Sequence, residues 1–488
     1  MININTNFNK TATHSGQTSI AFLVQLMGVK DKTIAQSNKL NLCLAIDVSS
    51  SMGEPIKREQ PRTNHSFYAI LKPQQPLRLD QLGPFIAQGP NATPVVFEPY
   101  NPNTPNWPNQ YPYDRTPLPG TEKKTINDYA AIVQQQQNHK IDLAKKAAIA
   151  AVEQLKEGDY ISIVTFESSS KTIVPSTEVT EFNKRQIIAQ IQQINSYGGT
   201  DLHSGWVQSA TEVAKKMSKN FINRVIVLSD GQTLQGITDP KRICQDVAAL
   251  CEKSITTSTF GIGDGFNEDL LQAMATSGNG NFYFIEKENE FSQMFQEEFS
   301  GLSNICAKNV KLRFTLEKDV TVQSVNDYEQ KDNVFSLASL THHKTLYSLF
   351  NFNVKLGKEK ILKLGTIELT YEDTQGVEHN TSIKLKLPVV SKTSWEAMPE
   401  NEEIKVQQTL QIIAKNQQTA TDLIDKGDIM GAQNMLKESC VYINSCGLND
   451  ERLIAQSTSL SASLEKSQDS NLFRKDLTYN SYKTRNSK

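Results

Sequence analysis

The sequence lacks the long apolar stretch of about 18 residues that a membrane-spanning helix needs. Its N-terminus, MININTNFNKTATHSGQ, has neither the basic nor the apolar block of a signal peptide. Its 51 basic and 53 acidic residues nearly cancel, so no overall field would recruit nucleic acid. The six cysteines include no Cys-x-x-Cys pair, which argues against a zinc site or a disulfide framework. We therefore expect a cytoplasmic protein with reduced thiols, no membrane span and no nucleic-acid partner.

Short β-type runs alternate with helical patterns between residues 40 and 304. Several of the runs are continuously apolar, which is typical of strands covered on both faces. The expected strands are LNLCLAI, YISIVTF, RVIVLSD, ITTSTFGIG and NFYFIE. Apolar positions at helical spacing predict helices at 141–155, 181–194, 202–217, 240–253 and 267–275. This alternation predicts an α/β fold with a doubly wound, mostly parallel sheet.

A Pro-rich insertion at 53–139 interrupts this rhythm and holds 14 of the 18 prolines. Because proline breaks helices and cannot donate a hydrogen bond within a sheet, we expect turns and extended chain there. After residue 305 the pattern becomes alternating strands without helices, which predicts an antiparallel β-sandwich over 305–392. The N-terminal segment 1–39 contains a similar strand that we expect to join the sandwich.

Amphipathic patterns predict a helical region at 400–470, with Gly427-Asp428 as a turn. Residues 471–488 are polar and lean basic, so we expect them to form a flexible tail.

Three polar clusters follow expected strands or precede an expected helix of the α/β unit. Asp47, Ser49 and Ser51 follow the first strand, Thr200 precedes a helix, and Asp230 ends the strand RVIVLSD. In a doubly wound sheet, ligands bind beyond the carboxyl ends of the strands. All five side chains offer oxygen, which is the donor set that Mg²⁺, Mn²⁺ or Ca²⁺ prefers. The sequence thus predicts a site for a hard divalent cation.

The segments DVSSS (47–51), GGTD (198–201) and LSDG (228–231) resemble the von Willebrand factor type A family and its metal-ion-dependent adhesion site. The resemblance extends from about residue 40 to 304 without the insertion. It is supported by KIDLAKKAAIAAVEQLKEGDYISIVTF and STFGIGDGFNEDLLQAMATSGNGNFYFI, which look like the bacterial and plant intracellular branch of that family. The sandwich and helices resemble the region that follows this domain in plant zinc-finger ubiquitin ligases and bacterial homologues, the VWA plus Vwaint arrangement. The ligases' RING residues are absent.

The resemblance implies roles for the five residues. Ser49, Ser51 and Thr200 would touch the metal directly, and Asp47 and Asp230 would act mostly through waters. Neutral ligands in direct contact with the cation would leave most of its positive charge uncancelled. One coordination position of the cation would remain exchangeable. A Glu or Asp of a partner could fill that position, so we expect a metal-dependent protein-binding module, an adaptor or assembly factor that performs no chemistry.

Two other functions fit the same site. One is a regulatory or substrate-coupling subunit of a AAA+ ATPase complex, a role that some intracellular family members have. The other is an enzyme, which is disfavoured because no nucleophile, acid–base pair or phosphate loop accompanies the site. The segment GIGDGF (261–266) does not have the spacing of a dinucleotide-binding loop.

The insertion departs from the family pattern, in which a helix follows the serines within a few residues. Its two ends must emerge beside the metal face, because Ser51 is a ligand and Lys140 begins the next helix. An acidic residue of the insertion could fill the open coordination position, its aromatic residues could belong to the partner surface, or it could be a passive cover. The acidic candidates are Glu54, Glu59, Glu98, Asp114 and Glu122.

Overall fold

The computed structural model describes residues 2–29, 38–56, 139–326, 328, 330–342, 344–355 and 360–486. These residues belong to one compact unit. Most of the predicted insertion, residues 57–138, lies outside the described residues, as do its candidate acids Glu59, Glu98, Asp114 and Glu122.

A six-stranded sheet forms the centre of the α/β domain, with the strand order β6-β5-β4-β7-β8-β9. All neighbouring strands are parallel except β5 and β6, which pair antiparallel at one edge. The fold-class prediction is therefore confirmed. The strands are β4 (Lys39–Asp47), β5 (Tyr160–Phe166), β6 (Ser170–Glu178), β7 (Phe221–Ser229), β8 (Ile255–Ile262) and β9 (Asn279–Ile285).

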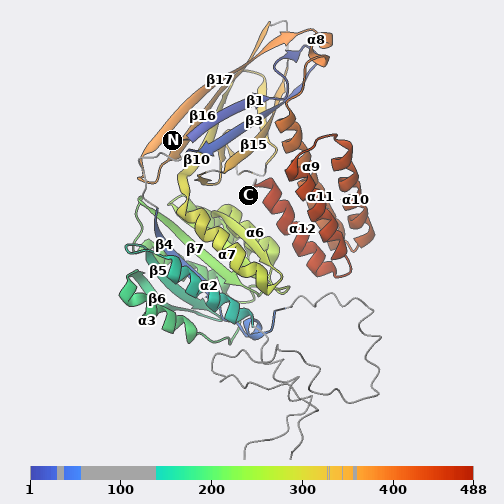
Figure 1. Cartoon of the computed structure of the whole chain (residues 1–488). Helices are drawn as coiled ribbons and strands as arrows, with labels where there is room; N and C mark the ends of the chain where they lie inside the picture. The colour runs from blue at the N-terminus through green and yellow to red at the C-terminus, as the bar shows by residue number, and fades with distance from the viewer. Residues whose placement is uncertain are drawn as a thin grey trace, which may run out of the picture. The chain divides into compact units, whose positions relative to one another are not determined.

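Helices cover both faces of this sheet (Figure 1). In β4, Leu42 and Leu44 pack into a core shared with α2, α3 and α7. The alternate residues Cys43 and Ala45 pack into a second core with α4, α5 and α6. This alternation explains why the strand is apolar at nearly every position. The helical elements are η1 (Ser50–Gly53), α2 (Lys140–Gln154), α3 (Glu181–Gln192), α4 (Leu202–Ala214), α5 (Pro240–Cys251), α6 (Glu268–Ser277) and α7 (Glu288–Ser303).

Two mostly antiparallel sheets, in one of which β2 pairs parallel with β17, share a third core and form the sandwich. One sheet has the order β1-β3-β15-β11, and β3 pairs antiparallel with β15 from Met27 opposite Thr345 to Ser19 opposite Asn353. The N-terminal strands thus belong to the sandwich, and the α/β domain lies between β3 and β10 in the chain. The strands are β1 (Ile2–Phe8), β2 (Thr13–His14), β3 (Ser19–Gly28), β10 (Ile305–Leu316), β11 (Val320–Ser324), β12 (Gln330–Lys331), β13 (Val334–Ser336), β14 (Leu340–Thr341), β15 (Thr345–Val354), β16 (Ile361–Glu372) and β17 (Glu378–Val390).

The C-terminal region is helical to the end of the described chain. After the short α8 (Lys392–Glu396) come α9 (Glu402–Asp425), α10 (Ile429–Ser445), α11 (Glu451–Glu465) and α12 (Ser470–Arg485), with a core of their own. The prediction of a flexible tail at 471–488 was wrong. Phe473 and Leu477, four residues apart, are buried in the core of the C-terminal helices, and Tyr482 is buried in a core of the α/β domain. The Asp469 side chain caps the helix by accepting a hydrogen bond from Leu472 N.

Helix α12 also binds the α/β domain. Lys475 forms a buried ion pair with Glu268 of α6 and donates to the carbonyl oxygen of Phe266 at 2.6 Å. The Tyr482 hydroxyl donates to the carbonyl oxygen of Gly280 in β9 at 3.1 Å. These contacts fix the last helix to the edge of the six-stranded sheet.

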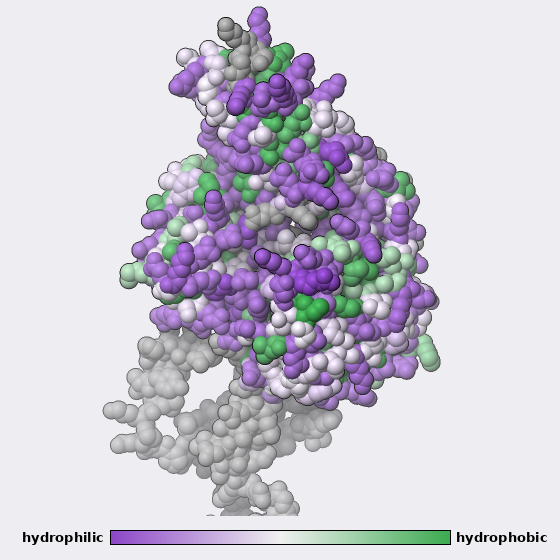
Figure 2. Space-filling view, turned by 180° about the vertical axis from the view of Figure 1, so that it is seen from behind, coloured by the Kyte–Doolittle hydropathy of each residue, from purple (hydrophilic) through white to green (hydrophobic). Residues whose placement is uncertain are grey.

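The face in Figure 2 is mostly hydrophilic, and its hydrophobic residues gather in small separate patches. Within the described residues, no helix combines the length and the apolar character that crossing a bilayer requires. The six cysteines all lie in the described part of the chain, and they form no disulfide with one another there.

Candidate metal site

The five predicted residues come from three segments at one edge of the six-stranded sheet. Strands β4 and β7 are parallel neighbours with Ile46 beside Leu228, so their carboxyl ends coincide. Asp47 is the last residue of β4, and Asp230 follows directly after β7. Ser49 and Ser51 lie in the turn that contains η1, and Thr200 lies two residues before α4.

Hydrogen bonds hold the carboxylates and hydroxyls of the site in place. Asp47 Oδ1 accepts from Ser49 N at 2.8 Å, and Asp47 Oδ2 accepts from Ser229 Oγ at 2.6 Å. Ser51 Oγ donates to Asp230 Oδ1 at 2.8 Å and lies 3.1 Å from Ser49 Oγ. Four of the predicted residues are therefore linked within one network, together with Ser229.

Because Gly231 has no side chain, a small space remains open beside the oxygens of the site. A Cβ atom on this residue would lie 3.1 Å from Thr200 Oγ1, 3.6 Å from Asp47 Oδ2 and 3.7 Å from Ser51 Oγ. Oxygens from two of the segments therefore face one small volume, and the third segment supplies the glycine that leaves this volume open. The structure brings the five predicted residues together, including Thr200, for which no hydrogen bond to the other four is described.

Burial makes ionisation of the carboxyl groups of Asp47 and Asp230 unfavourable. Asp47 is fully buried, and desolvation raises its pKa to about 6 although hydrogen bonds from Ser229 and Ser49 oppose this change. Burial likewise raises the pKa of Asp230, against the opposing effect of Lys140. A pair of neighbouring buried acids favours the binding of positive charge, because a cation offsets the cost of keeping both ionised.

Lys140 is a member of this site that the sequence reasoning missed. It is the first residue of α2, it is buried, and its Nζ donates to Asp230 Oδ2 at 2.7 Å. Burial lowers the pKa of Lys140, but the hydrogen bond and charge of Asp230 outweigh burial and raise the pKa above its usual value. Glu54, one of the acids considered as an occupant of the open position, instead lies 3.4 Å from Lys140 Nζ and is mostly exposed.

The chain segments on either side of residues 57–138 meet beside Lys140. Lys140 N donates to the carbonyl oxygen of Glu54 at 3.0 Å, and Pro55 and His139 form an antiparallel bridge. The chain therefore leaves and re-enters the domain at adjacent positions, beside the turn that carries Ser51.

The donor set fits a hard divalent cation. Oxygens of Thr200, Asp47 and Ser51 face the volume at Gly231, and Ser49 and Asp230 are hydrogen-bonded to Ser51. Hydroxyl and carboxyl oxygens are the ligands that Mg²⁺, Mn²⁺ and Ca²⁺ accept. In the described ranges, no three His, Cys, Asp or Glu side chains gather in a way that could hold a metal. His203 lies in α4, and its Nε2 is 3.1 Å from Asp246 Oδ2.

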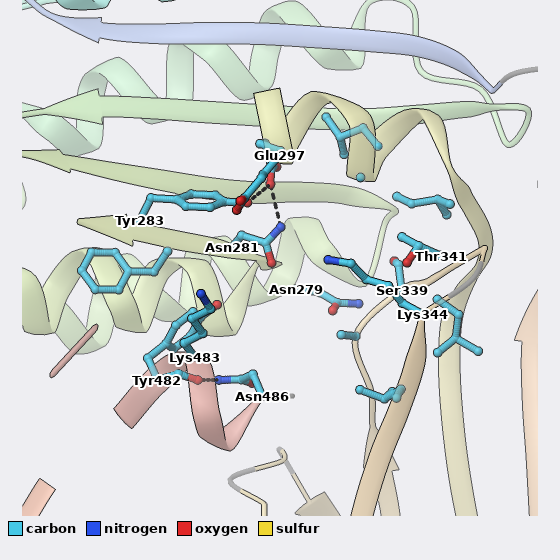
Figure 3. Close-up of a pocket in the computed structure, with 18 of the residues that line it drawn as sticks. Asn279, Asn281, Tyr283, Glu297, Ser339, Thr341, Lys344, Tyr482, Lys483 and Asn486 are labelled. Atoms are coloured by element: carbon cyan, nitrogen blue, oxygen red, sulfur yellow. Dashed lines mark hydrogen bonds between the residues drawn. The ribbon is translucent and has the colours of Figure 1, made fainter. Parts of the chain in front are cut away.

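A cavity of about 160 Å³ lies at the other end of β7, near Arg224. Figure 3 shows its walls, which come from β9, α7, the segment around Ser339 and Lys344, and α12. Beside it, buried Glu298 accepts from Arg224 Nη1 at 2.8 Å and from Asn281 Nδ2 at 2.6 Å. None of the five predicted metal ligands lines this cavity, so it is separate from the candidate site.

Comparison with known proteins agrees with the geometry. Residues 134–297 match the family model of the von Willebrand factor type A domain. The uncharacterized protein sll0103 of Synechocystis is 25% identical over 317 residues, which cover 61% of this chain and 73% of that protein. YfbK of Escherichia coli, also uncharacterized, is 31% identical over 175 residues, which cover 36% of this chain but only 30% of YfbK.

A solved structure shares the fold over most of the chain. The von Willebrand factor type A protein from Catenulispora acidiphila superposes with a TM-score of 0.61 at 14% identity and covers 95% of this chain and 89% of that one. The matched family range begins after Asp47, but β4 is hydrogen-bonded between β5 and β7 of the same sheet. The likeness to von Willebrand factor type A proteins therefore extends to the fold of the α/β domain, which includes the strand that carries Asp47.

Proposed function

We propose that the protein is a metal-dependent protein-binding module, an adaptor or assembly factor that docks an acidic side chain of a partner on a divalent cation. The observation that carries this proposal is the convergence of Thr200, Asp47 and Ser51 oxygens on the volume that Gly231 leaves open. Mg²⁺ is the expected ion, with Mn²⁺ or Ca²⁺ as substitutes. We propose no chemical step at this site and no enzymatic activity for the protein.

The residues of the chain define what such a site does. A bound cation supplies positive charge and a coordination position for an anionic ligand. Ser49, Ser51 and Thr200 contribute neutral oxygens, which leave that charge largely uncancelled. The two carboxyl groups are engaged by neighbouring donors, Asp47 by Ser229 and Asp230 by Lys140 and Ser51. A carboxylate of a partner is the ligand that such a centre attracts.

The loops beside the site expose apolar side chains that a protein partner would meet. Tyr197 is 55% exposed and Leu234 is 75% exposed. Their loops are tied to the site, because Tyr197 N donates to the carbonyl oxygen of Val48 and Leu234 N donates to that of Thr200. Exposed aromatic and aliphatic residues around a charged centre are typical of protein interfaces.

Calorimetric titration with Mg²⁺ and Mn²⁺ tests the proposal, followed by binding of an acidic peptide in the presence of the bound ion. Thr200→Ala should lose cation binding and peptide binding together, because it removes a ligand. Thr211→Ala is the matched control, since Thr211 is exposed on α4 and its hydroxyl donates to the carbonyl oxygen of Val207 in the same helix. Peptide binding by Thr211→Ala that persists in the presence of a chelator, or equal peptide binding by both variants in the presence of Mg²⁺, would contradict a metal-dependent function.

A further inference from the structure

Lys140 places a fixed positive charge inside the candidate metal site. Its side chain is 6% exposed, the Asp230 side chain is fully buried, and the two form an ion pair of 2.7 Å. Ser51 Oγ already occupies the other oxygen of Asp230. The ammonium group therefore takes one carboxylate oxygen while the hydroxyl of a predicted metal ligand takes the other.

The surrounding structure keeps the ammonium group at this position. The backbone of Lys140 is anchored by its hydrogen bond to Glu54 O. Gly263 has a positive φ of 75°, and a Cβ atom there would lie 3.1 Å from Lys140 Cε. A turn residue without a side chain thus leaves room for the lysine stem. Breaking a buried ion pair is costly, so we expect the contact with Asp230 to persist when a cation arrives.

This charge changes the electrostatic balance of the site. Ionised Asp47 and Asp230 carry two negative charges, and Lys140 contributes one positive charge. A bound divalent cation then leaves the buried groups with a net charge of plus one, whereas without Lys140 the sum would be zero. Glu54 also faces Lys140, but it is mostly exposed and therefore screened by solvent.

We propose that Lys140 weakens the intrinsic hold on the divalent cation and couples cation binding to the arrival of a carboxylate. The remaining positive charge disfavours the cation alone and favours the cation together with an anionic ligand. This inference rests on the proposed function, since it concerns the same site. It assigns to Lys140 the task of making the metal site strong only when a partner's acidic residue is present.

Titration of the full chain with MnCl₂ tests this coupling, with sodium acetate as the carboxylate probe and sodium chloride at equal ionic strength as the reference. In the wild type, acetate should raise the Mn²⁺ affinity at least about fivefold. Lys140→Met should bind Mn²⁺ at least about tenfold more tightly without acetate, since a buried like charge is removed. Its response to acetate should shrink to less than twofold.

Two further variants separate the alternatives. Lys146→Met, at an exposed position of the same helix, should behave as the wild type. Lys140→Gln keeps a donor near Asp230 without the charge and should reproduce the tighter binding, which covers the case in which Lys140→Met fails to fold. Unchanged or weaker Mn²⁺ binding in folded Lys140 variants, or no acetate effect in the wild type, would overturn the inference while leaving the metal site intact. Absence of Mn²⁺ binding in the wild type under every condition would overturn the proposed function and this inference with it.

Discussion

Replacing Asp47 by asparagine should stabilise the metal-free protein while abolishing its response to divalent cations. Burial raises the pKa of Asp47 from 3.8 to about 6, so the folded domain resists ionising this group. A shift of about two pKa units corresponds to about 3 kcal/mol in the free energy of unfolding at pH 7. Asparagine removes this cost. Its amide oxygen can still accept from Ser49 N, and its amide nitrogen can donate to Ser229 Oγ.

The sign of the effect follows from the direction of the pKa shift. A carboxyl group whose pKa is raised by folding contributes its full stability below about pH 4 and loses it as the pH rises through about 6. The stability advantage of Asp47→Asn should therefore be absent near pH 4, grow between pH 4 and 6, and reach up to about 3 kcal/mol at pH 7.

Chemical denaturation between pH 4 and 8, in the presence of a chelator, measures this advantage. The same experiment with 10 mM Mg²⁺ should add about 1–3 kcal/mol to the wild type if the dissociation constant lies between about 0.1 and 1 mM. The variant should gain nothing from Mg²⁺. Asp422→Asn, at an exposed position of α9, is a control that should match the wild type in both respects.

Two results would refute this reasoning. If Asp47→Asn were less stable than the wild type at pH 7 without metal, the ionised carboxylate of Asp47 would stabilise the folded protein even in the absence of a cation. If the variant kept the full Mg²⁺ response, the cation would bind elsewhere in the chain.

Three other changes probe different parts of the account. Gly231→Ala should lower Mn²⁺ affinity at least about tenfold in a calorimetric titration, because its Cβ would lie 3.1 Å from Thr200 Oγ1; unchanged affinity would place the ion elsewhere. Joining Ile56 to His139 by about five residues in place of 57–138 should preserve the fold, because Pro55 and His139 form a bridge beside the cut, and raise the free energy of unfolding by about 2 kcal/mol, since each halving of loop length gains about 0.6 kcal/mol; a loss would show that the removed residues stabilise the domain. Phe473→Ala should cost about 3–5 kcal/mol in denaturant unfolding because this ring of α12 is fully buried, and a loss below about 1 kcal/mol would mean that the last helix contributes little.

The regular elements of the α/β domain were predictable because their apolar residues follow the period of a buried strand or an amphipathic helix. Strand β6 was missed, since it is polar and contains Pro175, which an antiparallel edge strand tolerates. The signal for α7 was present in Phe291, Phe295 and Phe299, which recur every four residues and are buried. The mostly polar composition of α12 led to the prediction of a flexible tail, although its few apolar residues determine which face of the helix packs against the rest of the protein.

The candidate site also has residues that the sequence predicts and one that it does not. The proximity of the five oxygen-bearing residues could be predicted because they end or flank elements whose order along the chain implies a common edge of the sheet. Lys140 could not, because a lysine at the start of a helix ordinarily remains in solvent. Only closure of the insertion between Glu54 and Lys140, together with the space at Gly263, brings its ammonium group to Asp230.

A crystal structure of the protein grown with MnCl₂, with anomalous data collected near the manganese absorption edge, is the most direct test of the metal site. The account predicts one strong anomalous peak in the volume beside Gly231, within coordination distance of Ser49, Ser51 and Thr200. A peak elsewhere, or none at this position at millimolar Mn²⁺ with acetate present, would contradict it.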